Sequence, residues 1–159
     1  MKIFPPLVLV AVLLAVSGCG TSSTLDDTQL NGLRAQGKQF AKSMQAVGTD
    51  ATACSATGTS GTQPNLSIVQ TCLGNALGKA KDGLGTIVTY TDNLSTQVDG
   101  ACSTDLKAFG VAMTGAKETF AKAETQARGA DLTAMQATLK SLDSKKITST
   151  GNAAETACR

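Results

Sequence analysis

The sequence predicts an all-α domain, an antiparallel up-down-up-down four-helix bundle with two disulfides. Apolar residues recur three and four positions apart along four separate segments, which is the period of a helix that buries one face. The short glycine-containing connections around Gly100 and Gly129 favour helices that fold back on one another over an extended coiled coil. No segment alternates apolar and polar residues over a length that would predict a β-strand.

The first helix is predicted within residues 28–48, with Gly48 as its stop. A loop rich in Gly, Thr, Ser and Ala is expected over residues 48–64. The N-cap candidates of this helix are Asp26, Asp27 and Thr28, and its apolar positions are Leu30, Leu33, Gly37, Phe40, Met44 and Val47.

The second predicted helix covers residues 65–98. Glycines around Asp82 favour a kink there, and because the apolar phase continues across them, one kinked helix is favoured over two helices. The third helix is predicted over residues 103–128. The fourth is predicted over residues 131–146 with Asp131 as its N-cap, and alanines near the end of the chain permit a last helical stretch.

The first residues have the pattern of an export signal. Lys2 precedes an apolar run from Leu7 to Val16, which as a helix is about 15 Å long and too short to cross a bilayer. The end of this segment, Val16-Ser17-Gly18-Cys19, resembles the lipobox of bacterial lipoproteins.

That resemblance implies that the Cys19 thiol receives a diacylglycerol, that cleavage leaves Cys19 as the N-terminus, and that an N-acyl chain such as palmitate is added. It divides the chain into a signal peptide (1–18), the lipidated cysteine with a short tether (19–27) and a helical domain (28–159). Several acyl chains anchor a protein stably. The resemblance therefore implies an extracytoplasmic, membrane-bound protein, on the outer membrane if the cell has two membranes, because Gly20 stands where Asp signals retention.

Four of the five cysteines remain after Cys19, and an even number in an exported domain predicts disulfides. In the bundle, the loop after the first helix lies near the start of the second, while the third helix begins where the chain ends. The predicted pairs are therefore Cys54–Cys72 and Cys102–Cys158. A zinc site or a reactive thiol is the alternative, but both usually use close C-x-x-C pairs, which this sequence lacks.

Composition argues against most catalytic and metal sites. The chain has no histidine, which excludes Ser-His-Asp and Cys-His centres and histidine-containing metal sites within it. Glu118, Glu124 and Glu155 are too few, without histidine, for a di-iron bundle. With 14 basic and 12 acidic residues, nucleic-acid binding has little electrostatic support. We expect no enzyme, no metal and no cofactor besides the lipid on Cys19.

Two surface features have competing interpretations. Arg34, Lys38 and Lys42 form a row of cations four residues apart that could contact anionic lipid headgroups, or could be an ordinary solvated helix face. The Gly74-x-x-x-Gly78 pattern allows a close approach of helices, most simply inside the bundle.

The leading hypothesis for function is a non-enzymatic binding or structural role in the cell envelope, with a protein or cell-wall component as partner. A carrier of a small apolar ligand within the bundle is the alternative, because the alanine-rich seams leave the interior underfilled. A surface protein of the superinfection-exclusion type is another form of the binding role. The oligomeric state cannot be predicted from the sequence.

Overall fold

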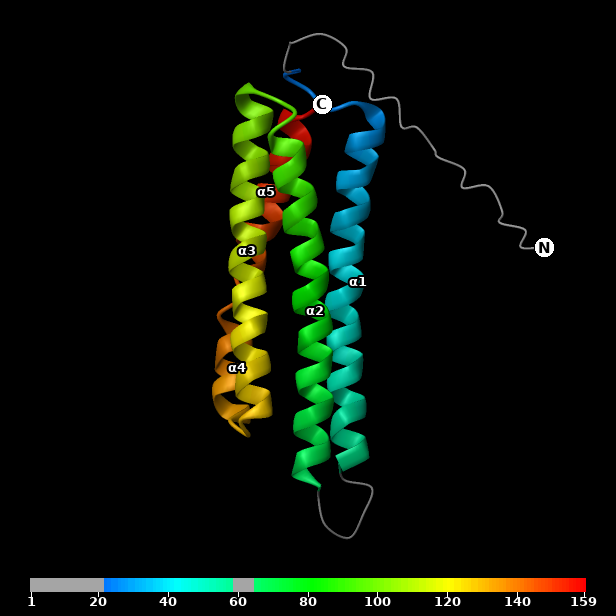
Figure 1. Cartoon of the computed structure of the whole chain (residues 1–159), viewed down its shortest axis with the longest axis vertical. Coiled ribbons are helices and arrows are strands. Elements are labelled where there is room, and N and C mark those ends of the chain that lie inside the picture. Colours follow the sequence, from blue (N-terminus) through cyan, green and yellow to red (C-terminus); the bar gives the residue numbers. More distant parts are fainter. Residues whose placement is uncertain (1–21, 59–64) are drawn as a thin grey trace, which may run out of the picture.

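The computed structural model describes residues 22–58 and 65–159. Within these ranges the protein has no β-strand, which confirms the all-α class (Figure 1). The predicted signal peptide and Cys19 lie outside the described residues. The helices are α1 (Asp27–Gly58), α2 (Leu66–Ser95), α3 (Gly100–Arg128), α4 (Leu132–Lys140) and α5 (Ser144–Ala157).

Helix α1 is longer than predicted. It begins as expected, because the Asp26 carboxylate accepts a hydrogen bond from the Gln29 backbone N–H at 2.8 Å. It does not stop at Gly48 but continues to Gly58. The predicted loop therefore begins ten residues too early. Within the extension, the buried Cys54 forms a disulfide with Cys72, which fastens this part of α1 to α2.

Helix α2 is a single element, as favoured from the apolar phase. Its Gly74 and Gly78 face α3, where a Cβ on Gly78 would lie 3.1 Å from an oxygen of Glu124. The side chains of Arg128 and Glu124 fill the space left by these glycines. The Glu124 carboxylate is also 2.8 Å from the Lys81 ammonium. The pattern thus serves packing inside the bundle.

The prediction of one continuous fourth helix over residues 131–146 is wrong. This stretch is broken into α4 and α5 by residues 141–143. Asp131 caps α4 as predicted by accepting from the Ala134 N–H at 2.9 Å. Asp143 caps α5 in the same way, accepting from the Lys146 N–H at 2.8 Å. The second cap starts a new helix at a point where the apolar pattern alone had suggested continuity.

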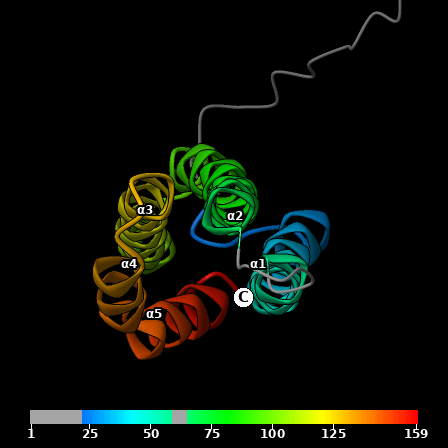
Figure 2. The ribbon, with the colours of Figure 1, turned by 90° about the horizontal axis from the view of Figure 1, so that it is seen from below.

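The helices lie in chain order around the long axis, as the end view shows (Figure 2). Helix α1 packs on α2, α2 on α3, and α3 on both α4 and α5. The contact of α5 with α1 is much smaller than its contact with α3, and no packing joins α1 to α4. The largest fully buried aliphatic and aromatic side chains come from α2 and α3: Leu77, Leu84, Ile87, Leu106, Met113 and Phe120.

Both predicted disulfides are confirmed. Cys54 of α1 is bonded to Cys72 of α2, with Cα atoms 5.6 Å apart. At the opposite end of the molecule, Cys102 of α3 is bonded to Cys158, which directly follows α5. The two crosslinks thus hold the two ends of the helical domain.

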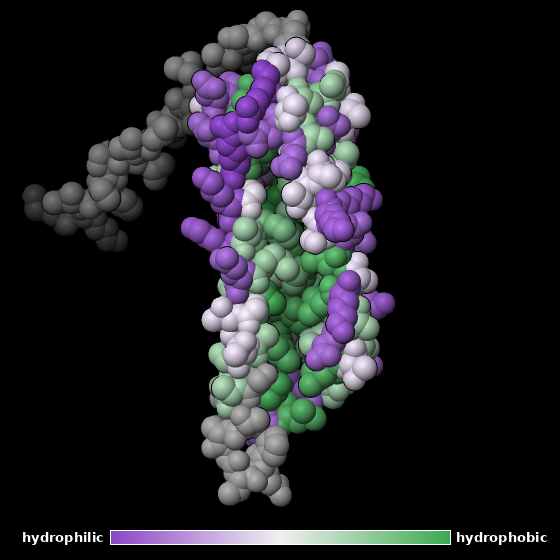
Figure 3. Space-filling view, turned by 180° about the vertical axis from the view of Figure 1, so that it is seen from behind, coloured by the Kyte–Doolittle hydropathy of each residue, from purple (hydrophilic) through white to green (hydrophobic). Residues whose placement is uncertain are grey.

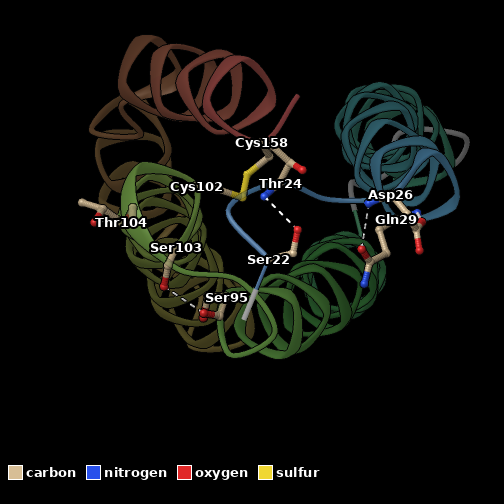
Figure 4. Close-up of a disulfide and its surroundings, with 10 residues drawn as sticks. Ser22, Thr24, Asp26, Gln29, Ser95, Cys102, Ser103, Thr104 and Cys158 are labelled. Carbon is tan, nitrogen blue, oxygen red and sulfur yellow. Dashed lines mark hydrogen bonds between the residues drawn. A yellow bond between two sulfur atoms is a disulfide. The ribbon is translucent and has the colours of Figure 1, made fainter. Parts of the chain in front are cut away.

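The segment before α1 lies across the Cys102–Cys158 end of the molecule (Figure 4). The Leu25 N–H donates to the Cys158 carbonyl at 2.9 Å, and the Asp99 N–H donates to the Ser22 carbonyl at 3.1 Å. The Leu25 side chain is buried. Residues 22–25, predicted to be tether, are therefore bound to the helical domain.

Candidate functional site

A groove of about 690 Å³ runs between α1 and α5, with α3 as its floor. The space-filling view from behind shows an apolar stripe along the molecule between hydrophilic margins (Figure 3). The apolar side chains that line the groove are Leu33, Phe40, Ala41, Met44, Phe109, Met113 and Ile147.

The groove exists because α5 is too short to cover the whole apolar face of α1. Helix α1 has 32 residues and α5 only 14. Leu30 and Leu33, near the start of α1, are buried, but Phe40 and Met44, further along the same seam, are only partly buried. The apolar face of α1 is thus covered at one end and open along its middle.

The α5 wall comes close to the floor at Gly151. A Cβ on this residue would lie 3.3 Å from the Phe109 ring, tighter than ordinary contact. Gly37, on the α1 wall, has the opposite environment: a Cβ there would meet nothing within 4 Å. One glycine therefore lets the helices approach, and the other leaves a vacant part of the groove.

An ion-pair cluster closes the groove at one end. Arg34 lies 3.0 Å from the Glu155 carboxylate, which also pairs with Arg159. The hydrogen bonds from Arg159 and then Arg34 hold the pKa of Glu155 below its ordinary value. Glu155 is the single carboxylate among the groove-lining residues, and it remains ionised at neutral pH.

The predicted lipid-contact residues lie along this groove. Arg34 and Lys38 are among its lining residues, and Lys42 continues the row along α1 without lining it. Lys42 is 15 positions after Asp27, about 22 Å along the helix. The row therefore runs away from the end of α1 that receives the chain from Cys19.

The groove has few polar side chains. Its one carboxylate is engaged by two arginines, and its other polar side chains are Lys38, Thr148 and Asn152. In residues 22–58 and 65–159, no three cysteine or carboxylate side chains gather where they could hold a metal ion. None of the helices in that part of the chain has the length and apolarity to cross a membrane.

The residues of the groove were visible in the sequence, but the groove was not. Leu33, Gly37, Phe40 and Met44 belong to the predicted apolar seam of the first helix. Nothing in that seam indicates that its partner helix is short. The one signal in the sequence was that the apolar pattern fades beyond Ile147, which indicates a weakly apolar end to the chain.

Comparison with known proteins leaves the function to be argued from this geometry. No protein-family model, no curated protein and no solved structure matches the chain.

Proposed function

We propose that this chain is a lipid-anchored lipoprotein of the cell envelope with a binding role and no enzymatic one, and that the α1/α5 groove is its binding site. The observation that carries the binding role is the groove itself. Its volume of about 690 Å³ is typical of small-molecule sites, and its floor is apolar with a few polar groups at one end. A large apolar surface left open on a small domain usually has a partner.

The lipid anchor is argued from the lipobox-like residues that end in Cys19. The binding of residues 22–25 to the Cys102–Cys158 end is consistent with it, because that end then lies next to the bilayer. As the finer architecture, we propose an antiparallel up-down-up-down bundle in which α4 and α5 together act as the fourth member.

A carrier of a small apolar ligand is the form of binding that the groove favours. The groove is bounded by helices on three sides and closed at one end by the Arg34–Glu155 pair. A carrier needs such partial enclosure, since enclosure removes most of a small ligand's surface from water. A flat helix face would suit an envelope protein or cell-wall partner better.

Replacing Cys19 tests the anchor. The full chain and its Cys19→Ala variant are expressed in a bacterium fed radiolabelled palmitate, and the membranes are separated from soluble fractions. We expect label and membrane association for the unchanged chain and neither for the variant. Cys19→Ala protein that still carries label would contradict lipidation at this residue.

Filling the groove tests the binding site. A Cβ at Gly37 meets open space, so Gly37→Leu is expected to place an isobutyl group in the groove. Gly48→Leu is the matched control, because Gly48 lies in the same helix, also meets nothing within 4 Å, and does not line the groove. Native mass spectrometry of the full chain released from nonionic detergent measures bound dodecanol. We expect binding to the unchanged chain and to Gly48→Leu, and loss of binding in Gly37→Leu.

A further inference from the structure

The open rim of the groove has an excess of positive charge. On the α1 side, Arg34, Lys38 and Lys42 follow one another at intervals of four residues. On the α5 side, Lys145 is on the same helix as Thr148 and Asn152, with which it shares a shallow surface hollow next to the groove. Glu155 is the one acidic side chain that lines the groove.

The charge of Glu155 is already neutralised within the molecule. It pairs with both Arg34 and Arg159, so these three side chains together have a net charge of +1. Lys38, Lys42 and Lys145 have no ion-pair partner among residues 22–58 and 65–159. One unpaired ammonium, that of Lys38, therefore lines the groove, and two more, those of Lys42 and Lys145, lie on the flanking surfaces of α1 and α5.

Most polar lining side chains lie toward one end of the groove, where the apolar Leu33 and Phe109 also lie, and the other end is mainly apolar. Arg34, Lys38, Asn152 and Glu155 lie toward the end closed by the ion pair, since α1 and α5 are joined there. Phe40, Met44 and Ile147 lie toward the other end. Asn152 is exposed and lines the groove, where its side-chain amide can donate to a ligand. The groove thus has a cationic, hydrogen-bonding end and an apolar end.

The shape of the groove suits one extended chain. Its α1 wall runs from Leu33 to Met44, about 16 Å of helix, and its width is the gap between two helices. Met44 and Met113 line it, and flexible methionine side chains adapt to apolar partners of irregular outline. A rigid, compact ligand would use this elongated space poorly.

We propose that the groove binds a single-chain amphiphile with an anionic head, such as a fatty acid or a single-chain alkyl phosphate. The apolar chain lies over Phe109 and Met113, and the head lies near Lys38 and Asn152. This inference rests on the proposed function and names the ligand class of the same site. A cationic head would be repelled by the rim, and a neutral head would gain nothing from it.

Four probes with the same dodecyl chain separate the contribution of the head from that of the chain. Dodecanoate, dodecyl phosphate, dodecanol and dodecyltrimethylammonium are titrated into the full chain, and dissociation constants are measured by native mass spectrometry. We expect at least one of the two anions to bind about tenfold more tightly than dodecanol, and the cation to bind most weakly. The stronger of the two anions identifies a carboxylate or a phosphate as the natural head.

Charge reversal on the rim gives a matched pair of variants. Lys38→Glu should weaken dodecanoate binding by about tenfold and leave dodecanol binding within about twofold. Lys79→Glu makes the same charge change on α2, which contributes no residue to the groove, and should leave both constants unchanged. Loss of dodecanol binding in Lys38→Glu would show damage to the groove and not an effect of charge, so the thermal unfolding of each variant is compared first.

The outcomes distinguish this inference from the proposed function. Binding of dodecanoate and dodecyl phosphate that is no tighter than binding of dodecanol would overturn the anionic head and leave the apolar binding site intact. Failure of every probe to bind would overturn the proposed function as well. A dimer that Gly37→Leu dissociates, or an acidic amphipathic peptide that dodecanoate cannot displace, would assign the groove to a polypeptide and also overturn the inference.

Discussion

Gly32 shows how one missing side chain fixes the contact between α1 and α2. A Cβ at Gly32 would lie 2.9 Å from Cζ of Tyr90 and closer still to its hydroxyl oxygen. That hydroxyl donates to the Gln29 carbonyl across the helix pair. We expect Gly32→Ala to lower the free energy of unfolding by about 1–3 kcal/mol, because it overpacks this contact despite the better helix propensity of alanine.

The same substitution five residues later supplies the control. Gly37 has vacant space around its Cα, so Gly37→Ala should raise the free energy of unfolding by about 0.5–1 kcal/mol. Urea unfolding followed by circular dichroism measures both variants. An increase in the free energy of unfolding for both variants would show that helix propensity and not the Tyr90 contact decides the effect.

Glu124 makes stability depend on pH. The hydrogen bond from Lys81, followed by that from Arg128, holds the pKa of Glu124 below its ordinary value of 4.5. Because the unfolded chain takes up this proton at higher pH than the folded one, the stabilisation is present at neutral pH and is lost as pH falls through and below 4.5. Thermal unfolding of the unchanged chain and of Glu124→Gln should therefore differ at neutral pH and converge in acid.

Glu155 titrates in both proteins of that comparison, so its contribution cancels. A difference in melting temperature that stayed constant from neutral pH into acid would show that Glu124 acts by packing beside Gly78 and not by its charge.

At the scale of the helix, the extension of α1 beyond Gly48 depends on the Cys54–Cys72 disulfide. A crosslink over 18 positions stabilises the folded state by about 3 kcal/mol in the chain-entropy model. We expect the Cys54→Ser/Cys72→Ser double variant to lose hydrogen-exchange protection over residues 49–58 while α3 keeps its own. Equal loss in both helices would mean that the extension and the core unfold as one unit.

The elements differ in how far the sequence could predict them. Asp26 and Asp131 were recognisable as caps, and the 3–4 spacing of apolar residues located the helices. Residues 49–58 lack that spacing because they are mostly threonine and alanine. The disulfide between Cys54 and Cys72, which the spacing does not show, ties them to α2. The capping role of Asp143 was equally hard to recognise, because the apolar pattern gave no sign that one helix ends and another begins there.

At the scale of the whole molecule, the α1/α5 groove could not be predicted because it results from a difference in length between two helices. Each lining residue obeys the pattern of its own helix. The groove arises because α5 ends its apolar face after about two turns while that of α1 continues. Periodicity describes one helix at a time and does not indicate how much of its apolar face a neighbour covers.

The binding of residues 22–25 to the helical domain predicts how the protein stands on a membrane. If lipid is attached at Cys19, two residues separate Cys19 from Ser22. The Ser22 carbonyl accepts a hydrogen bond from Asp99, in the loop between α2 and α3. The three Cα–Cα steps from Cys19 to Ser22 span at most about 11 Å, so the Cys102–Cys158 end must lie at the bilayer surface. Lys42 then lies about 22 Å along α1 from that end, too far for steady contact with headgroups in an upright molecule.

Quenching by lipid tests this orientation. A fluorescent amino acid is placed at Gln97, in the loop at the bilayer end, or at Gln45, exposed in the middle of α1, and the lipidated chain is reconstituted in vesicles that contain a headgroup quencher. We expect strong quenching at Gln97 and little at Gln45, with no dependence on anionic lipid, because the surface potential decays within a Debye length of about 8–10 Å. Strong quenching at Gln45 that rises with anionic lipid would instead place the Arg34, Lys38 and Lys42 row flat on the membrane. The groove beside that row would then face the bilayer, and its ligand would enter directly from the lipid phase.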